Sequence, residues 1–81
     1  MSDYTPIECE LYERFELAIM RGERLLLCWR DPDGLSHLEP IMPRDLRTEK
    51  GKEFLLAERD GGLTCQLRLD AILTARPAPH A

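Results

Sequence analysis

The stretch that decides the fold reads Cys9-Glu10-Leu11-Tyr12-Glu13-Arg14-Phe15-Glu16-Leu17-Ala18-Ile19-Met20-Arg21-Gly22. Apolar residues fall at Leu11, Phe15, Ala18 and Ile19, with Tyr12 beside them, and this spacing makes one apolar stripe along a helix. Acidic residues crowd the first turns, where the helix dipole favours negative charge. Gly22 is a residue that commonly ends helices. The stretch therefore predicts an amphipathic helix over residues 9–21.

Beyond Gly22 the hydrophobic period changes to that of strands, and turn signals divide the chain into short segments. We expect turns at residues 31–34, 49–52 and 60–62, where proline, glycine and charged residues gather. The expected strands are Leu25–Trp29, Ser36–Leu46, Glu53–Arg59, Leu63–Leu69 and Ile72–Ala75.

The second of these strands contains Pro40 and Pro43. Proline cannot donate a hydrogen bond to a neighbouring strand, so this strand should lie at a sheet edge or bend sharply. In the fourth strand, Leu63, Cys65, Leu67 and Leu69 should share one face.

One helix followed by five strands predicts a mainly β fold, a small five-stranded antiparallel barrel capped by the N-terminal helix. Both OB-like and Sm-like barrels satisfy this pattern. The leading helix, the bent second strand and the short step between the last two strands favour the Sm-like arrangement. We expect a single domain over residues 1–76, with strands over 24–76, and a flexible tail over 77–81.

The chain has 81 residues and a net charge of -4. Nucleic-acid binding draws much of its energy from cations that neutralise phosphates, so this balance disfavours it. An acidic domain suits a basic protein surface better.

Cys9, Cys28 and Cys65 form no closely spaced pair. With no leader sequence or membrane span expected, they predict reduced thiols in a cytoplasmic protein.

We expect no catalytic residues, metal ligands or cofactor-binding residues in this chain. His37 lies in a strand and His80 in the tail, and neither has a nucleophile at a recognisable spacing. The cysteines lack the paired spacing of zinc modules. RNA binding would need exposed aromatic residues, yet Phe15, Tyr12 and Phe54 are expected in the core.

The outer face of the predicted helix carries the clearest candidate site. A rotation of about 100° per residue places Cys9, Glu10, Glu13, Glu16, Leu17 and Met20 opposite the apolar stripe. Apolar side chains rimmed by carboxylates are typical of an interaction surface. A solvated acidic face explains the same pattern, and periodicity leaves both interpretations open.

The chain opens with Tyr4-Thr5-Pro6-Ile7-Glu8-Cys9-Glu10-Leu11-Tyr12-Glu13, followed by Phe15-Glu16-Leu17-Ala18. This opening resembles the Rof family, whose members inhibit the transcription termination factor Rho. Further similar residues are Asp45-Leu46, Glu53-Phe54-Leu55, Gly61 and Arg68-Leu69-Asp70-Ala71-Ile72. Departures from the family pattern include Ile19 in place of a frequent cysteine, Leu11 in place of an acidic residue, and a longer first hairpin turn.

The resemblance implies an Sm-like barrel and a non-enzymatic bacterial regulator. Such a protein binds the RNA-binding N-terminal domain of Rho, hinders RNA loading and reduces Rho-dependent termination. The resemblance implies that Glu10, Glu13 and Glu16 face basic residues of Rho, and we add Leu17 and Met20 to the expected contact surface. Tyr12 is expected to support the helix. The alternative function is an Sm-like RNA-binding module. We expect a monomer that binds no membrane.

Overall fold

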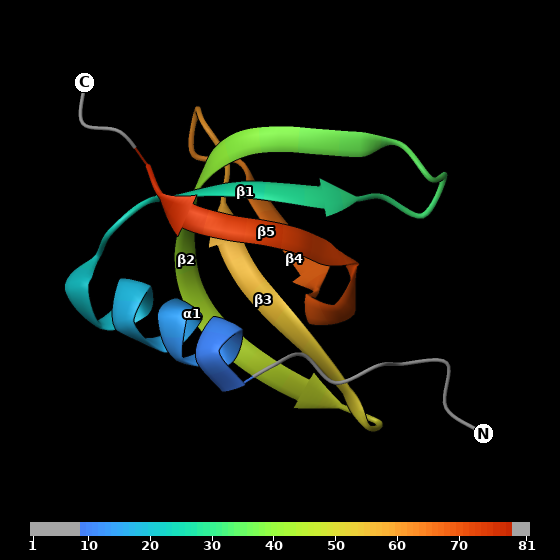
Figure 1. The fold of residues 1–81 in the computed structure, drawn as a ribbon, viewed down its shortest axis with the longest axis horizontal. Coiled ribbons are helices and arrows are strands. Elements are labelled where there is room, and N and C mark those ends of the chain that lie inside the picture. The colour runs from blue at the N-terminus through green and yellow to red at the C-terminus, as the bar shows by residue number, and fades with distance from the viewer. Residues whose placement is uncertain (1–8, 79–81) are drawn as a thin grey trace.

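The computed structural model describes residues 9–78 (Figure 1). The chain order is α1 (Cys9–Arg21), β1 (Leu25–Arg30), β2 (Ser36–Glu49), β3 (Lys52–Glu58), β4 (Thr64–Arg68), a 3-10 turn η1 (Leu69–Ala71) and β5 (Ile72–Pro77). Within the described part of the chain, no helix is long and apolar enough to cross a membrane.

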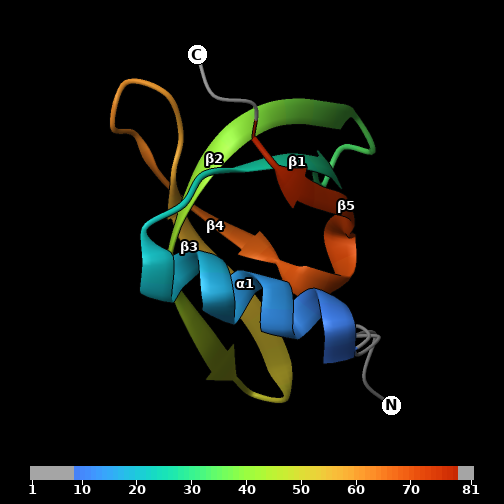
Figure 2. The same cartoon turned by 60° about the vertical axis from the view of Figure 1, so that its left-hand side comes forward.

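The helix α1 occupies the range that the periodicity predicts, and it buries the predicted stripe. Phe15 is fully buried and Ala18 nearly so, while Leu11, Tyr12 and Ile19 pack partly buried against the same core. Gly22 follows with φ of 65°, a left-handed conformation that glycine adopts without strain. Figure 2 shows α1 lying across one end of the curled sheet.

The five strands form one antiparallel sheet in the order β4-β3-β2-β1-β5. This confirms the expected mainly β fold, with five antiparallel strands and one N-terminal helix. The pairings between described residues do not include one between β4 and β5. These two strands are joined directly by the three residues of η1.

The strand β2 contains two prolines and connects the two halves of the curled sheet. Residues 36–41 pair with β1 and residues 42–49 pair with β3, with a register shift between Pro43 and Asp45. Two alternatives were expected for this strand, an edge position or a sharp bend, and the structure shows the bend, where β2 passes from pairing with β1 to pairing with β3. Because each half of β2 pairs with only one neighbour, the side of each half that has no ladder can hold a proline.

The core lies between the inner face of the sheet and α1. Its sheet residues include Leu25, Leu27 and Trp29 of β1, which alternate with less buried neighbours. Phe54 was expected in the core, but it is only half-buried because Leu55 and Ala57 point inward from β3 and Phe54 points to the opposite face.

Two boundary expectations are also corrected. Leu63 precedes β4 rather than belonging to it, and its side chain is 65% exposed instead of sharing the inner face. Two residues expected in the tail are held by the fold, since Pro77 ends β5 and the backbone N–H of Ala78 donates a hydrogen bond to the carbonyl of Arg24. The remaining residues of the expected tail, 79–81, lie outside the described residues, as do residues 1–8.

Candidate functional site

The structure brings the predicted site residues together on one side of α1. Glu10, Glu13 and Glu16 are all exposed, and so are Leu17 and Met20, whose side chains are 46% and 81% exposed. We call these five residues the outer face of α1. The helix can present them outward because the opposite stripe, centred on Phe15, holds it against the core.

The arginines of α1 leave these carboxylates without a partner from their own helix. Arg14 donates through Nη1 to the backbone carbonyl of Ala75 in β5. Arg21 lies 3.9 Å from Glu23, beyond the end of the helix. Over residues 9–78 no ion pair involves Glu10, Glu13 or Glu16. Within the described residues, the negative charge of this face is therefore not neutralised by an ion pair.

A hollow of about 310 Å³ extends the outer face toward the sheet. It is lined by Cys9, Tyr12, Glu13 and Glu16 from α1 and by Glu53 from β3. The side chain of Glu53 thus adds a fourth carboxylate to the surroundings of the helix. Sequence reasoning missed it because β3 meets α1 only through the fold, and no local pattern links the two segments.

The aromatic side chains of the described residues are buried or half-buried. Trp29 is 5% exposed and Phe15 fully buried, while Tyr12 and Phe54 are intermediate. Stacking of bases on a protein needs an exposed ring. These side chains therefore offer little surface for nucleobases.

Much of the positive charge on the sheet is neutralised within the chain. The ion pairs join Arg24 to Asp60, Arg44 to Glu58, Arg47 to Glu49, Arg59 to Glu39 and Arg68 to Asp70. Paired cations attract phosphates weakly because the neighbouring carboxylates cancel their field. These five arginines are therefore expected to attract phosphates less strongly than unpaired cations would.

A second cluster, of charged side chains and a histidine, surrounds Trp29 of β1. The His37 ring stacks on the indole, with centroids 5.1 Å apart and planes 13° from parallel. The Arg59 guanidinium lies 5.9 Å from the indole centroid. Arg59 also donates two hydrogen bonds to the Glu39 carboxylate, at 2.9 and 2.5 Å. His37 therefore contacts both an aromatic ring and, through Asp31, the turn that follows β1.

Asp31 connects this cluster to the turn between β1 and β2. Its Oδ1 accepts the backbone N–H groups of Asp33 and Leu35, and its Oδ2 lies 2.7 Å from Nε2 of His37. The hydrogen bond from His37 is the main reason that the pKa of Asp31 is lowered. The hydrogen bonds from Arg59 likewise lower the pKa of Glu39. The hydrogen bonds of Asp31 hold the β1–β2 turn in place, and those between Arg59 and Glu39 join the end of β3 to β2.

The three cysteines are free thiols, with Cys9 exposed and Cys28 and Cys65 half-buried. Burial raises the pKa of the Cys65 thiol. Within residues 9–78 no three His, Cys, Asp or Glu side chains come close enough to hold a metal ion. His80 lies outside the described residues.

No family model matches the chain, and neither a curated protein nor a solved structure does.

Proposed function

We propose that this protein is a Rof-like, non-enzymatic regulator of transcription termination. It binds the RNA-binding N-terminal domain of Rho through the outer face of α1, hinders RNA loading and so reduces Rho-dependent termination. The proposal places the protein in the cytoplasm, acting as a monomer, with no cofactor and no direct contact to nucleic acid.

The observation that carries the proposal is the unpaired, exposed charge of α1. Glu10, Glu13 and Glu16 are exposed, and residues 9–78 supply none of them with an ion pair. A protein domain that binds RNA presents basic residues to its ligand. Carboxylates on a rigid helix complement such a surface, and complementary charge both speeds encounter and fixes orientation.

Leu17 and Met20 give the same face an apolar contribution. Both side chains lie among the carboxylates, and Met20 is the most exposed large apolar side chain of residues 9–78. Burying them against a partner would add hydrophobic energy of about 25 cal/mol per Å² of apolar surface removed from water. An interface with an apolar centre and a charged rim is the common arrangement in protein complexes.

Titration calorimetry of the full chain against the purified N-terminal domain of Rho tests the proposal. We expect binding at low salt that weakens as salt is added, because salt screens exposed charges. Single-stranded RNA should compete with the protein. Absence of binding at low salt, or binding that RNA leaves unchanged, would contradict the proposal.

Charge-reversal variants test which face binds. Glu10→Lys and Glu13→Lys should each raise the Kd by about tenfold or more, equivalent to about 1.4 kcal/mol. Asp33→Lys is the matched control, since it makes the same charge change at an exposed residue of the β1–β2 turn. If all three variants bind Rho equally well, the outer face of α1 is not the contact surface.

A further inference from the structure

The strand β4 is one end of the sheet formed by the described residues, and its outer edge is more regular than that of β5, the other end strand. Its pairing with β3 continues over Thr64–Arg68 without a bulge, and the strand contains no proline. The other end strand, β5, finishes at Pro77 and has a register shift against β1. Proline and bulges are devices that protect sheet edges from further pairing. Within residues 9–78, β4 pairs only with β3.

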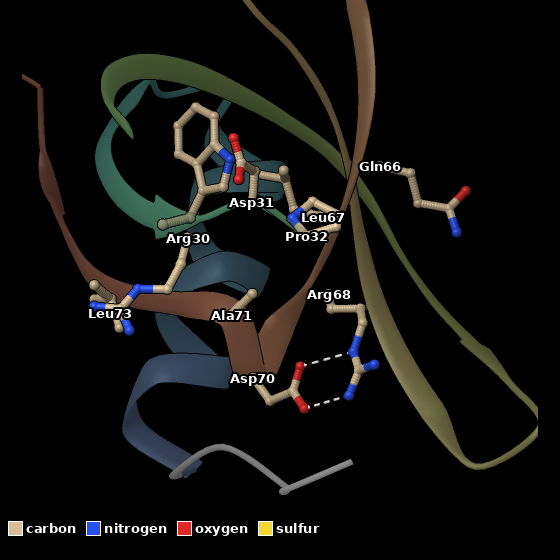
Figure 3. Close-up of a pocket in the computed structure, with 10 residues that line it drawn as sticks. Arg30, Asp31, Pro32, Gln66, Leu67, Arg68, Asp70, Ala71 and Leu73 are labelled. Carbon is tan, nitrogen blue, oxygen red and sulfur yellow. Dashed lines mark hydrogen bonds and ion pairs between the residues drawn. The ribbon is translucent and has the colours of Figure 1, made fainter. Parts of the chain in front are cut away.

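A hollow of about 570 Å³ lies along this edge (Figure 3). Three consecutive residues of β4, Gln66, Leu67 and Arg68, line it. Successive side chains of a strand point to opposite faces, so a hollow lined by three in a row lies at the strand's edge. The hollow therefore sits where an added strand would place its side chains.

The far wall of the hollow comes from the end of β1, the turn after it and the start of β5. Arg30, Pro32 and Leu73 contribute to this wall. Figure 3 shows Arg30 and Leu73 on the opposite side of the hollow from Arg68. Leu73 is 51% exposed, an apolar side chain left open to solvent at the rim. The walls are mostly apolar, and the volume is within the range of about 300–1,000 Å³ common for binding pockets.

The charges around the hollow leave one cation uncompensated. Arg68 holds Asp70 through two hydrogen bonds, at 3.0 and 2.6 Å. The carboxylate of Asp31 is engaged by its own turn and by His37. The exposed side chain of Arg30 has no ion pair within the described residues. A ligand with a carboxylate at this rim would meet a favourable charge.

We propose that the β4 edge and its hollow bind an extended segment of a partner protein by strand addition. The segment would match the five residues of β4, place an apolar side chain in the hollow beside Leu73 and an acidic side chain against Arg30. In this mode of recognition the main chain supplies affinity and a side-chain pocket supplies specificity. The surface shares no residue with the outer face of α1, so the proposal is independent of Rho binding.

Selection of a displayed library of random peptides on the full chain tests the proposal. We expect enriched peptides that alternate apolar and polar residues and contain an acidic residue. When these peptides are synthesised and titrated, amide NMR shifts should concentrate in residues 64–68. Failure to enrich any peptide, or shifts centred elsewhere, would overturn the proposal.

Two pairs of variants make the test specific. Arg30→Glu and Leu73→Asp should each weaken the selected peptides by about tenfold, because they remove the cation and the apolar rim. Arg76→Glu and Leu38→Asp are the controls, since both residues are exposed and neither lines the hollow. If the two pairs of variants weaken peptide binding equally, the proposal is overturned. Circular dichroism of each variant checks that it is folded.

Sedimentation of the wild-type chain separates a partner segment from a second copy. We expect a monomer over the concentrations used for the titrations. A dimer that Arg30→Glu dissociates would mean that another copy occupies the edge, and the proposal would be wrong. Rho binding measured on the same four variants should stay unchanged, so failure of one proposal is distinguishable from failure of the other.

Discussion

Replacing Phe15 with alanine should remove a large part of the stability of the fold and release the helix that carries the outer face. The Phe15 side chain is fully buried between α1 and the sheet. Truncation of a buried phenylalanine to alanine typically costs about 3–5 kcal/mol, the sum of lost burial and a residual cavity. At about 0.05–0.15 kcal/mol per residue, the whole chain should have about 4–12 kcal/mol of stability.

The destabilisation expected for Phe15→Ala is therefore comparable with the lower end of the expected free energy of unfolding. If the wild-type stability is near that lower end, the Phe15→Ala variant should be partly unfolded. Phe15→Leu keeps most of the buried apolar area and should cost about 1–2 kcal/mol. Leu17→Ala is the matched control on the same helix. Because the Leu17 side chain is 46% exposed, this change should alter the free energy of unfolding by no more than about 0.5 kcal/mol.

Urea denaturation followed by two probes measures these values. Trp29 is the single tryptophan, so its fluorescence reports on the sheet, and far-ultraviolet circular dichroism also records α1. We expect the two transitions to coincide in the wild type, as in a cooperative two-state domain. The packing argument fails if Phe15→Ala destabilises the chain no more than Leu17→Ala does. It also fails if the wild-type helix melts before the sheet.

Two further predictions follow from groups with shifted pKa values. The hydrogen bonds that lower the pKa of Asp31 and Glu39 should stabilise the fold fully above about pH 4–5 and lose their effect as the pH falls through the lowered folded-state pKa values. Urea titrations between neutral and acidic pH should therefore show that Asp31→Asn or Glu39→Gln loses less free energy of unfolding than the wild type as the pH falls. If both variants lose as much as the wild type, this reasoning is contradicted. Because burial raises the pKa of Cys65 and hides part of its surface, iodoacetamide should label exposed Cys9 before Cys65 at neutral pH. Peptide mass spectrometry measures the order in which the cysteines are labelled. Faster labelling of Cys65 than of Cys9 would contradict this expectation and show that β4 opens readily.

The sequence determined the helix and the turns because the patterns that predict them involve residues close together in the chain. A stripe at helical spacing fixed both the bounds of α1 and the face that it buries, with Phe15 at its centre. The outer face followed by the same geometry, since whatever lies opposite a buried stripe is exposed. Turn residues such as Gly34, with φ of 86°, marked where strands must reverse.

The tertiary structure alone decided which distant residues meet. The two prolines of β2 permitted either an edge position or a bend, and the choice depended on β1 and β3 sharing that strand between them. The stacking of His37 on Trp29 and the approach of Glu53 to α1 likewise depend on strand register and sheet curl. Such contacts join segments whose separation along the chain carries no periodic signal, so only the packing of the whole core fixes them.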